Sequence, residues 1–282
     1  MALIRVLKKG AAAAALSYKQ LLVIWVVSLI MILFVSFPLR VMLNAVFGNS
    51  MAVMRLTDGF DAGLLGDVGK PFLYLLSAAG TGGLLLLLAG FLLYTFFAGG
   101  LFASYTTAWG GIRMTAFIRE SAHNFLPFLK VNLLTLLIIA GYTFVVLGIP
   151  AAARMALAKG SMPEGGSMVL FYSIWILGLP LWLFVADASR RWIAATGSGR
   201  AFRAMGAGFR ALKERFWLSY GTVLLILIVN GIFIFISFWY LTCSVPEKGG
   251  MIFLFFIVTQ IMFFIRLFMK AWRYASVCET AR

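Results

Sequence analysis

The sequence is poor in charged residues, in cysteine and in histidine. A soluble domain carries about 25% charged residues, whereas only 12% of these 282 residues are Asp, Glu, Lys or Arg and 63% are hydrophobic. This scarcity excludes a soluble globular domain, because too few charged side chains are present to cover its surface. The single histidine, His123, cannot by itself form a zinc site, and Cys243 and Cys278 lack the spacing of metal ligands or of a disulfide framework. We therefore expect no metal, no cofactor and no disulfide scaffold.

Six long apolar runs make up much of the sequence. They cover residues 21–38, 73–100, 127–149, 168–187, 218–241 and 251–269. A helix of about 20 apolar residues crosses a hydrocarbon core about 30 Å thick. The runs do not alternate polar and apolar residues, as the strands of a membrane barrel would. The sequence therefore predicts an all-α, polytopic helical membrane protein with six transmembrane helices in a single domain, residues 1–282.

Acidic residues are scarce too, with nine Asp and Glu against 24 Lys and Arg and a formal net charge of +15. If each run crosses once and the N-terminus is cytoplasmic, eighteen of the Lys and Arg residues lie inside and six outside. Since Lys and Arg in short loops set the orientation, this split predicts cytoplasmic N- and C-termini. Seven of the basic residues fall in the loop between the fourth and fifth runs. Their place beside the bilayer indicates contact with anionic lipid rather than with nucleic acid.

The chain also divides into three similar units, over about residues 1–110, 111–195 and 196–282. Each unit begins with a polar or basic segment (5–20, 114–130 and 200–217) and continues with two apolar runs. Both 118–128 and 209–219 place apolar residues seven apart and an aromatic residue where the apolar run starts. We interpret the plan as an internal repeat of three hairpins, each preceded by an amphipathic interfacial helix.

The third of these segments has the clearest pattern. Phe202, Met205, Phe209, Leu212 and Phe216 follow a three–four spacing, which places them on one face of a helix. Such a helix lies in the membrane interface with its aromatic face in the acyl region and its cations toward lipid phosphates. The candidate headgroup contacts are Arg190, Arg191, Arg200, Arg203, Arg210, Lys213 and Arg215.

Few polar residues lie in the middle of the apolar runs. Asn230 and Gln260 each lie near the middle of a run and form a candidate intramembrane polar pair between the fifth and sixth helices. Hydrogen bonds of this kind contribute about 0.6 kcal/mol each, so the pair would be modest structural support. A polar path for a ligand is the alternative interpretation.

Charged residues occur only near the ends of the runs. Lys130 and Arg266 lie near the cytoplasmic ends, where long side chains reach the headgroups. Asp187 ends the fourth run and is followed by Arg190 and Arg191. Either a local ion pair neutralises this acid, or it forms a headgroup or ion site with the arginines of the following helix.

Small residues are concentrated in the second run, where Ala79 and Gly83 form a small-xxx-small pair. Such pairs allow a second helix to approach closely, inside the bundle or in a homo-oligomer. Glycines in this run also permit a bent helix that lines a cavity. In the outer loop that precedes it, Asp58, Asp61 and Asp67 lack the spacing of a calcium-binding loop.

Four stretches of the chain, 97–102, 117–130, 200–220 and 260–274, resemble a family of uncharacterised bacterial six-span integral membrane proteins. The plan of a basic helix followed by a hairpin is also similar to the membrane domain of some glycerophosphodiester phosphodiesterases. That domain is not the catalytic one. The resemblance therefore implies a multi-pass protein of the bacterial cytoplasmic (inner) membrane, and it implies no known activity or functional residues.

The sequence contains no motif for catalysis, which favours a protein that is not an enzyme. We expect a scaffold or a subunit of a membrane assembly, which contacts lipid and partner membrane proteins or a second copy of itself. The alternative is a transporter or carrier of a lipid or small amphiphile, with a cavity between the second, fifth and sixth helices. A membrane-embedded enzyme would instead need Asp187, Arg190 and Arg203 gathered around a headgroup-sized pocket.

Overall fold

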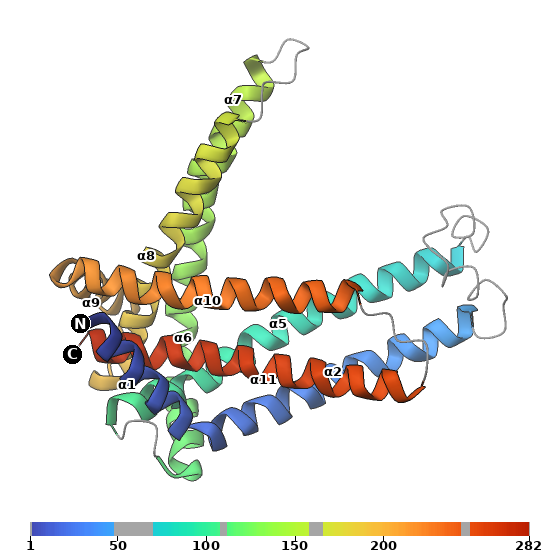
Figure 1. Ribbon diagram of the computed structural model, residues 1–282, viewed down its shortest axis with the longest axis horizontal. Helices are drawn as coiled ribbons and strands as arrows, with labels where there is room; N and C mark the ends of the chain where they lie inside the picture. Colours follow the sequence, from blue (N-terminus) through green and yellow to red (C-terminus); the bar gives the residue numbers. More distant parts are fainter. Residues whose placement is uncertain (1, 48–69, 108–111, 158–165, 244–248, 282) are drawn as a thin grey trace. The chain divides into compact units, whose positions relative to one another are not determined.

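The computed structural model describes residues 2–47, 70–107, 112–157, 166–243 and 249–281, and within these ranges almost every residue is helical and none lies in a strand. Figure 1 labels the elements. They are α1 (Ala2–Leu16), α2 (Tyr18–Phe47), α5 (Lys70–Thr107), α6 (Met114–Thr143), the π-helical segment η1 (Phe144–Gly148), α7 (Ile149–Leu157), α8 (Gly166–Thr196), α9 (Ala201–Glu214), α10 (Phe216–Cys243) and α11 (Gly249–Thr280). The predicted all-α class is confirmed. Backbone contacts group the chain into a larger unit, Met1–Leu22 with Thr95–Arg282, and a smaller one, Val23–Tyr94.

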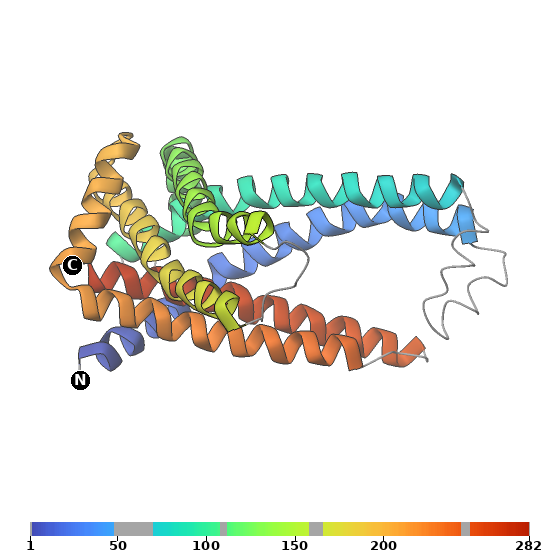
Figure 2. The same ribbon diagram turned by 90° about the horizontal axis from the view of Figure 1, so that it is seen from above.

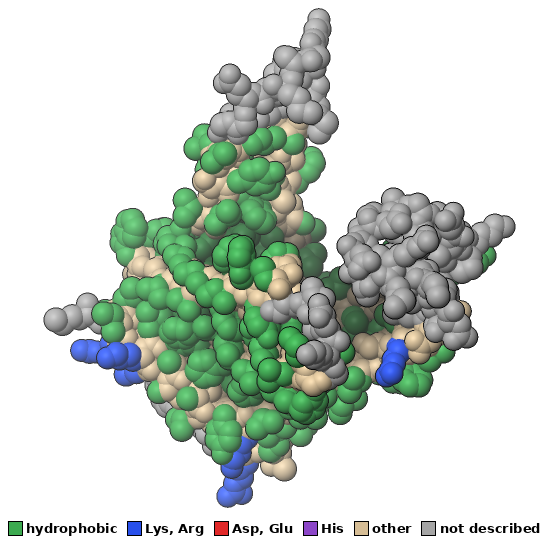
Figure 3. Space-filling model, turned by 45° about the vertical axis from the view of Figure 1, so that its right-hand side comes forward, with side chains coloured by type: hydrophobic (Ala, Val, Ile, Leu, Met, Phe, Trp, Pro, Cys, Tyr) green, Lys and Arg blue, Asp and Glu red, His purple; other side chains and the backbone are tan. Residues whose placement is uncertain are grey.

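Six of the described helical segments are long and apolar enough to cross a membrane, one for each predicted span. They are Tyr18–Met42, Leu76–Thr107, Met114–Ala153, Met168–Thr196, Phe216–Cys243 and Gly250–Thr280. Large apolar side chains on them are exposed, as Phe235, Phe238 and Trp239 are on α10. Figure 3 shows one face on which hydrophobic side chains predominate and Lys and Arg are isolated. Leaving apolar surface in water costs about 25 cal/mol per Å², so this surface is compatible with an integral, multi-pass membrane protein.

Two of the three predicted interfacial segments form separate helices. A turn at Ser17 divides α1 from α2, and Arg215, with φ −136° and ψ 51°, divides α9 from α10. The expectation of a separate helix over 114–130 is wrong, because α6 runs unbroken from Met114 through the start of the third apolar run at residue 127. Its interior contains no glycine before Gly141, and Pro127 is accommodated within the helix.

The helix of the first apolar run is longer than the run itself. The run covers residues 21–38, whereas α2 continues through Pro38 to Phe47. Asp58, Asp61 and Asp67 lie outside the described residues.

Three close helix crossings hold the larger unit together, and each is centred on a glycine. The pairs are Gly10 with Ser276 (α1 on α11), Gly100 with Ser121 (α5 on α6) and Gly208 with Ser189 (α9 on α8). A Cβ atom added at Gly208 would lie 2.5 Å from the backbone oxygen of Val185, closer than van der Waals contact allows. Only glycine therefore permits α9 to approach α8 this closely, and the same argument holds at the other two crossings.

The first and last helices of the chain lie side by side within this unit (Figures 1 and 2). Besides the Gly10 crossing, Trp272 Nε1 donates a hydrogen bond to the backbone oxygen of Leu7 at 2.9 Å. Lys9 Nζ lies 2.8 Å from Glu279 Oε1 in an ion pair. These contacts fix α1 against α11 and so join the two ends of the chain.

The smaller unit consists of parts of α2 and α5. An added Cβ at Gly82 would lie 3.3 Å from Val35, and one at Gly90 would lie 3.8 Å from Met31, so these glycines face α2. The predicted packing pair lies elsewhere on α5. Ala79 is exposed and a Cβ at Gly83 would meet no atom within 4 Å. Packing of Ala79 and Gly83 against a second copy remains a prediction.

Helix α8 is central to the core of the larger unit. Its Phe184 and Ala188 pack against Val223 of α10 and Val277 of α11, and Leu212 of α9 covers the edge of this cluster. The arrangement surrounds the second half of α8 with other helices, and the polar residues on that half are consequently buried.

Candidate functional site

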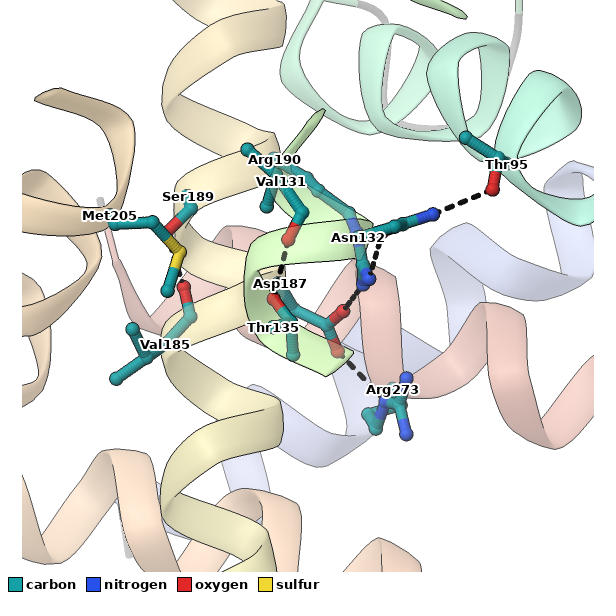
Figure 4. A network of polar contacts seen from close by, with 10 residues as sticks. All are labelled: Thr95, Val131, Asn132, Thr135, Val185, Asp187, Ser189, Arg190, Met205 and Arg273. Carbon is teal, nitrogen blue, oxygen red and sulfur yellow. Dashed lines mark hydrogen bonds and ion pairs between the residues drawn. The ribbon is translucent and has the colours of Figure 1, made fainter. Parts of the chain in front are cut away.

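Asp187 lies on this second half of α8 and is fully buried. Arg190, one turn further along the same helix, pairs with its Oδ1 atom. Arg273 of α11 places its Nε atom 2.8 Å from Oδ2, and both ion pairs are drawn in Figure 4. Each oxygen of the carboxylate therefore has its own guanidinium group, and both arginine side chains are largely buried.

The network continues from Arg190 to two more helices. Asn132 of α6 accepts hydrogen bonds at its Oδ1 atom from Arg190 Nε, at 2.9 Å, and from Arg190 Nη2. Its amide nitrogen donates to Thr95 Oγ1 of α5 at 2.6 Å. We call Thr95, Asn132, Asp187, Arg190 and Arg273 the Asp187 cluster.

The Asp187 cluster connects α5, α6, α8 and α11 through charged and amide groups in a largely buried place. Two guanidinium groups and one carboxylate give it a formal charge of +1. A buried ion pair resists loss of one partner, since the remaining charge is left uncompensated at a cost of about 3–5 kcal/mol. The cluster therefore acts as a tether between these helices.

The sequence singled out part of this cluster and missed the rest. The local ion pair of Asp187 with Arg190 is present, but its second partner is Arg273, on a helix 86 residues away along the chain. The alternative third member, Arg203, is exposed on α9. The sequence offered one signal for Arg273: basic residues follow the sixth apolar run, as they follow the fourth.

Arg191 and the basic residues of α9 take different positions from Arg190. Arg191 donates to the backbone oxygen of Ala281, beyond the end of α11. The remaining headgroup candidates are exposed, on α9 or at its two ends. They are Arg200, Arg203, Arg210, Lys213 and Arg215.

The aromatic stripe predicted for α9 is divided between two faces. The face that packs on α8 carries Ala204, Met205 and Gly208, which are buried. Phe202 is 81% exposed and Phe209 is 43% exposed. The expectation that Met205 shares one lipid-facing stripe with the phenylalanines is wrong, because the close crossing at Gly208 turns the small residues of α9 toward α8.

Asn230 and Gln260 are half-buried on α10 and α11. The described part of the chain shows no hydrogen bond between their side chains, so the pair remains a prediction.

A groove of about 610 Å³ lies between the third and fourth spans. It is lined by Ala140, Thr143, Phe144, Leu147, Gly148, Ala151, Met168 and Tyr172. Three of these residues lie on η1 and Thr143 directly precedes it, and π-helical segments inside α-helices frequently occur at functional sites. Hydrogen bonds from Tyr142 to the Ile174 oxygen at 2.7 Å and from Trp175 to Thr143 at 2.9 Å join the two helices beside it.

No group of three or more His, Cys, Asp or Glu residues that could hold a metal ion occurs within the described ranges. Comparison of the chain with protein-family models, curated proteins and solved structures finds no match.

Proposed function

We propose that this chain is a non-enzymatic protein of the bacterial cytoplasmic membrane that serves as a scaffold or as a subunit of a membrane assembly. In this proposal both termini are cytoplasmic, the six spans form three repeated hairpins, and α9 lies on anionic lipid of the cytoplasmic leaflet. Partner membrane proteins or a second copy of the chain complete the assembly. The likeness to uncharacterised bacterial six-span membrane proteins belongs to the same proposal.

The exposed surface of α9 carries the proposal. Its outward face combines Arg203, Arg210 and Lys213 with Phe202, and Trp217 follows at the start of α10 with 83% of its surface exposed. Cations beside exposed aromatic rings suit the interface, where rings lie at headgroup level and cations meet phosphate. The buried polar groups near it are engaged with one another in the Asp187 cluster, which supports a structural rather than a catalytic role for them.

Lipid retention in nanodiscs of mixed phosphatidylglycerol and phosphatidylcholine tests the lipid contact. Each basic residue near an anionic surface contributes about 1 kcal/mol. The triple variant Arg203→Gln/Arg210→Gln/Lys213→Gln should therefore lose most of the enrichment in phosphatidylglycerol, and the enrichment should fall as salt is raised. Arg40→Gln, on the exposed surface of α2 and predicted to lie outside, is the control for removal of a positive charge. An unchanged lipid ratio in the triple variant would refute the contact.

Extraction in mild detergent tests the assembly. We expect a second copy or another membrane protein to remain bound, as measured by light scattering and mass spectrometry. A monodisperse single chain with no bound protein would count against a subunit role.

The groove beside η1 favours a second function, carriage of a lipid or small amphiphile. Its apolar lining and its size suit an acyl chain. Proteoliposomes with a fluorescent lipid, bleached from the outside, measure this activity. Bleaching no faster than in protein-free vesicles would exclude it, and filling the groove by Gly148→Leu should slow the bleaching if lipid passes there.

A further inference from the structure

The groove beside η1 lies in one half of its hairpin, which Figure 1 labels α6, α7 and α8. On the first side of the hairpin the lining falls within 140–151, and on α8 it consists of Met168 and Tyr172. The third and fourth apolar runs are 127–149 and 168–187. The lining therefore lies mainly in the second half of the third run and the first half of the fourth. In the proposed orientation these halves lie in the outer leaflet.

The wall of the groove is apolar and is hollowed by small residues. Gly148 and Ala151 line it, so little side-chain volume fills the space in front of them. The ring of Phe144 lies close to Gly148, since a Cβ added at the glycine would be 3.1 Å from Cδ2 of the ring. Thr143 and Tyr172 contribute hydroxyl groups, and the other lining side chains are apolar. Hydrocarbon can therefore cover most of this wall without burying an unpaired polar group.

The two helices are joined at the inner end of the groove. Trp175 of α8 donates its indole N–H to the Thr143 hydroxyl at 2.9 Å. Beside it, the Tyr142 hydroxyl donates to the backbone oxygen of Ile174 at 2.7 Å. Trp175 lies three residues beyond Tyr172, so it is one turn of α8 nearer the middle of the span. We call the Trp175–Thr143 contact the floor of the groove. Because its indole N–H is already paired, an apolar chain end can rest against it.

The dimensions of the groove indicate what fills it. Thr143 and Ala151 are eight residues apart, which is about 12 Å at 1.5 Å per residue. One leaflet of a hydrocarbon core of about 30 Å is about 15 Å thick, so the groove has nearly the depth that a single acyl chain covers. A helix with side chains is 10–12 Å across and would occupy about 1,100 Å³ over the same depth, nearly twice the groove's 610 Å³. A single flexible chain therefore fits better than a helix of a partner protein.

We propose that the groove binds one acyl chain of a membrane phospholipid, and that Trp175 sets the longest chain that fits. The proposal rests on the second proposed function in its choice of the groove, and it names what the groove selects. Binding against the floor does not require that lipid crosses the membrane. It also does not require the basic residues of α9, because the site recognises the chain and not the headgroup.

Native mass spectrometry of the full chain in detergent measures this selection. The probes are lysophosphatidylcholines with lauroyl, myristoyl, palmitoyl and stearoyl chains, whose zwitterionic headgroup gives the basic residues of α9 no net charge to attract. We expect one bound lipid per chain, with a preferred chain length and weaker binding of longer chains. Gly148→Leu fills the groove and should abolish this binding. Trp175→Leu lowers the floor and should shift the preference to a longer chain by at least one member of the series.

Two further variants keep the test independent of folding defects. Trp175→Phe retains an aromatic ring and is the milder change, and it should shift the preference in the same direction. Trp239→Leu removes a tryptophan that is 63% exposed on α10, and it should leave the preference unchanged.

The outcomes separate this site from lipid carriage. Undiminished binding in Gly148→Leu would overturn the groove as the site, as would a dimer that binds no lipid. An unchanged preference in the folded Trp175 variants, or the same shift in Trp239→Leu, would overturn the role of Trp175. If these binding results are as expected but lipid bleaching is no faster than in protein-free vesicles, carriage is excluded and the acyl-chain site stands.

Discussion

Replacement of Asp187 by asparagine should destabilise the fold more than any other change of a single charge. The substitution preserves the size of the side chain and an oxygen that Arg190 can reach, so it creates no cavity. It removes the negative charge between two guanidinium groups whose side chains are only 12% and 14% exposed. Since loss of one partner from a buried pair costs about 3–5 kcal/mol, we expect the lower end, about 3 kcal/mol. That loss corresponds to a decrease of roughly a hundredfold in the ratio of folded to unfolded protein.

Unfolding in mixed micelles of mild detergent and SDS, followed by circular dichroism, measures this difference. The matched control is Glu120→Gln, which removes the acid from an exposed ion pair with Arg119 at 3.4 Å. The Arg119 side chain is 77% exposed, and surface pairs of this kind contribute about 0–1 kcal/mol. The control should therefore unfold at nearly the same SDS fraction as the unmodified chain.

A second substitution separates charge from packing. In the variant Asp187→Asn/Arg273→Gln, one uncompensated guanidinium is removed, and the double variant should be more stable than Asp187→Asn alone. If Asp187→Asn and Glu120→Gln lower the free energy of unfolding equally, the cluster is not an electrostatic tether. The same conclusion holds if Arg273→Gln destabilises the Asp187→Asn variant as much as it destabilises the unmodified chain.

Three further predictions follow from single contacts. Gly208→Ala should lower the free energy of unfolding by about 1–3 kcal/mol through overpacking. Its control, Gly206→Ala, has open space around the added Cβ and should raise that free energy by up to about 1 kcal/mol through helix propensity. Equal effects of the two substitutions in the SDS titration would contradict the close crossing. Tyr105→Phe removes the 2.9 Å hydrogen bond to Ser17 and should cost about 1 kcal/mol in the same titration, and a cost of zero would show that this bond adds nothing. Cys243 is exposed and Cys278 is buried, so an impermeant maleimide should label only Cys243 on intact spheroplasts. Labelling of Cys243 only after permeabilisation would reverse the proposed orientation.

The apolar part of each helix is largely a local property, and sequence reasoning located it, although α2 and α11 continue beyond their apolar runs to Phe47 and Thr280. The fifth apolar run, 218–241, lies within α10 (Phe216–Cys243), and the sixth, 251–269, lies within α11. Lipid and helix geometry together set a minimum length of apolar sequence, and that length can be counted along the chain. The breaks near Ser17 and Arg215 separate α1 and α9 from their spans as expected, but nothing in the residues 114–130 showed that α6 would continue without one.

The ion-pair partners of Asp187 on other helices could not be predicted from the sequence, for a different reason. Arg203 and Arg273 both lie beyond the end of an apolar run, and the sequence alone allowed either of them to pair with Asp187. Only the packing of α11 beside α8 places Arg273 against the carboxylate, while the crossing at Gly208 turns α9 so that Arg203 is exposed. The sequence by itself determined that six segments of the chain are apolar enough to cross a membrane, because hydrophobicity acts residue by residue along a helix. The tertiary structure alone decided which charges are buried together, because that depends on how closely and at what rotation the helices meet.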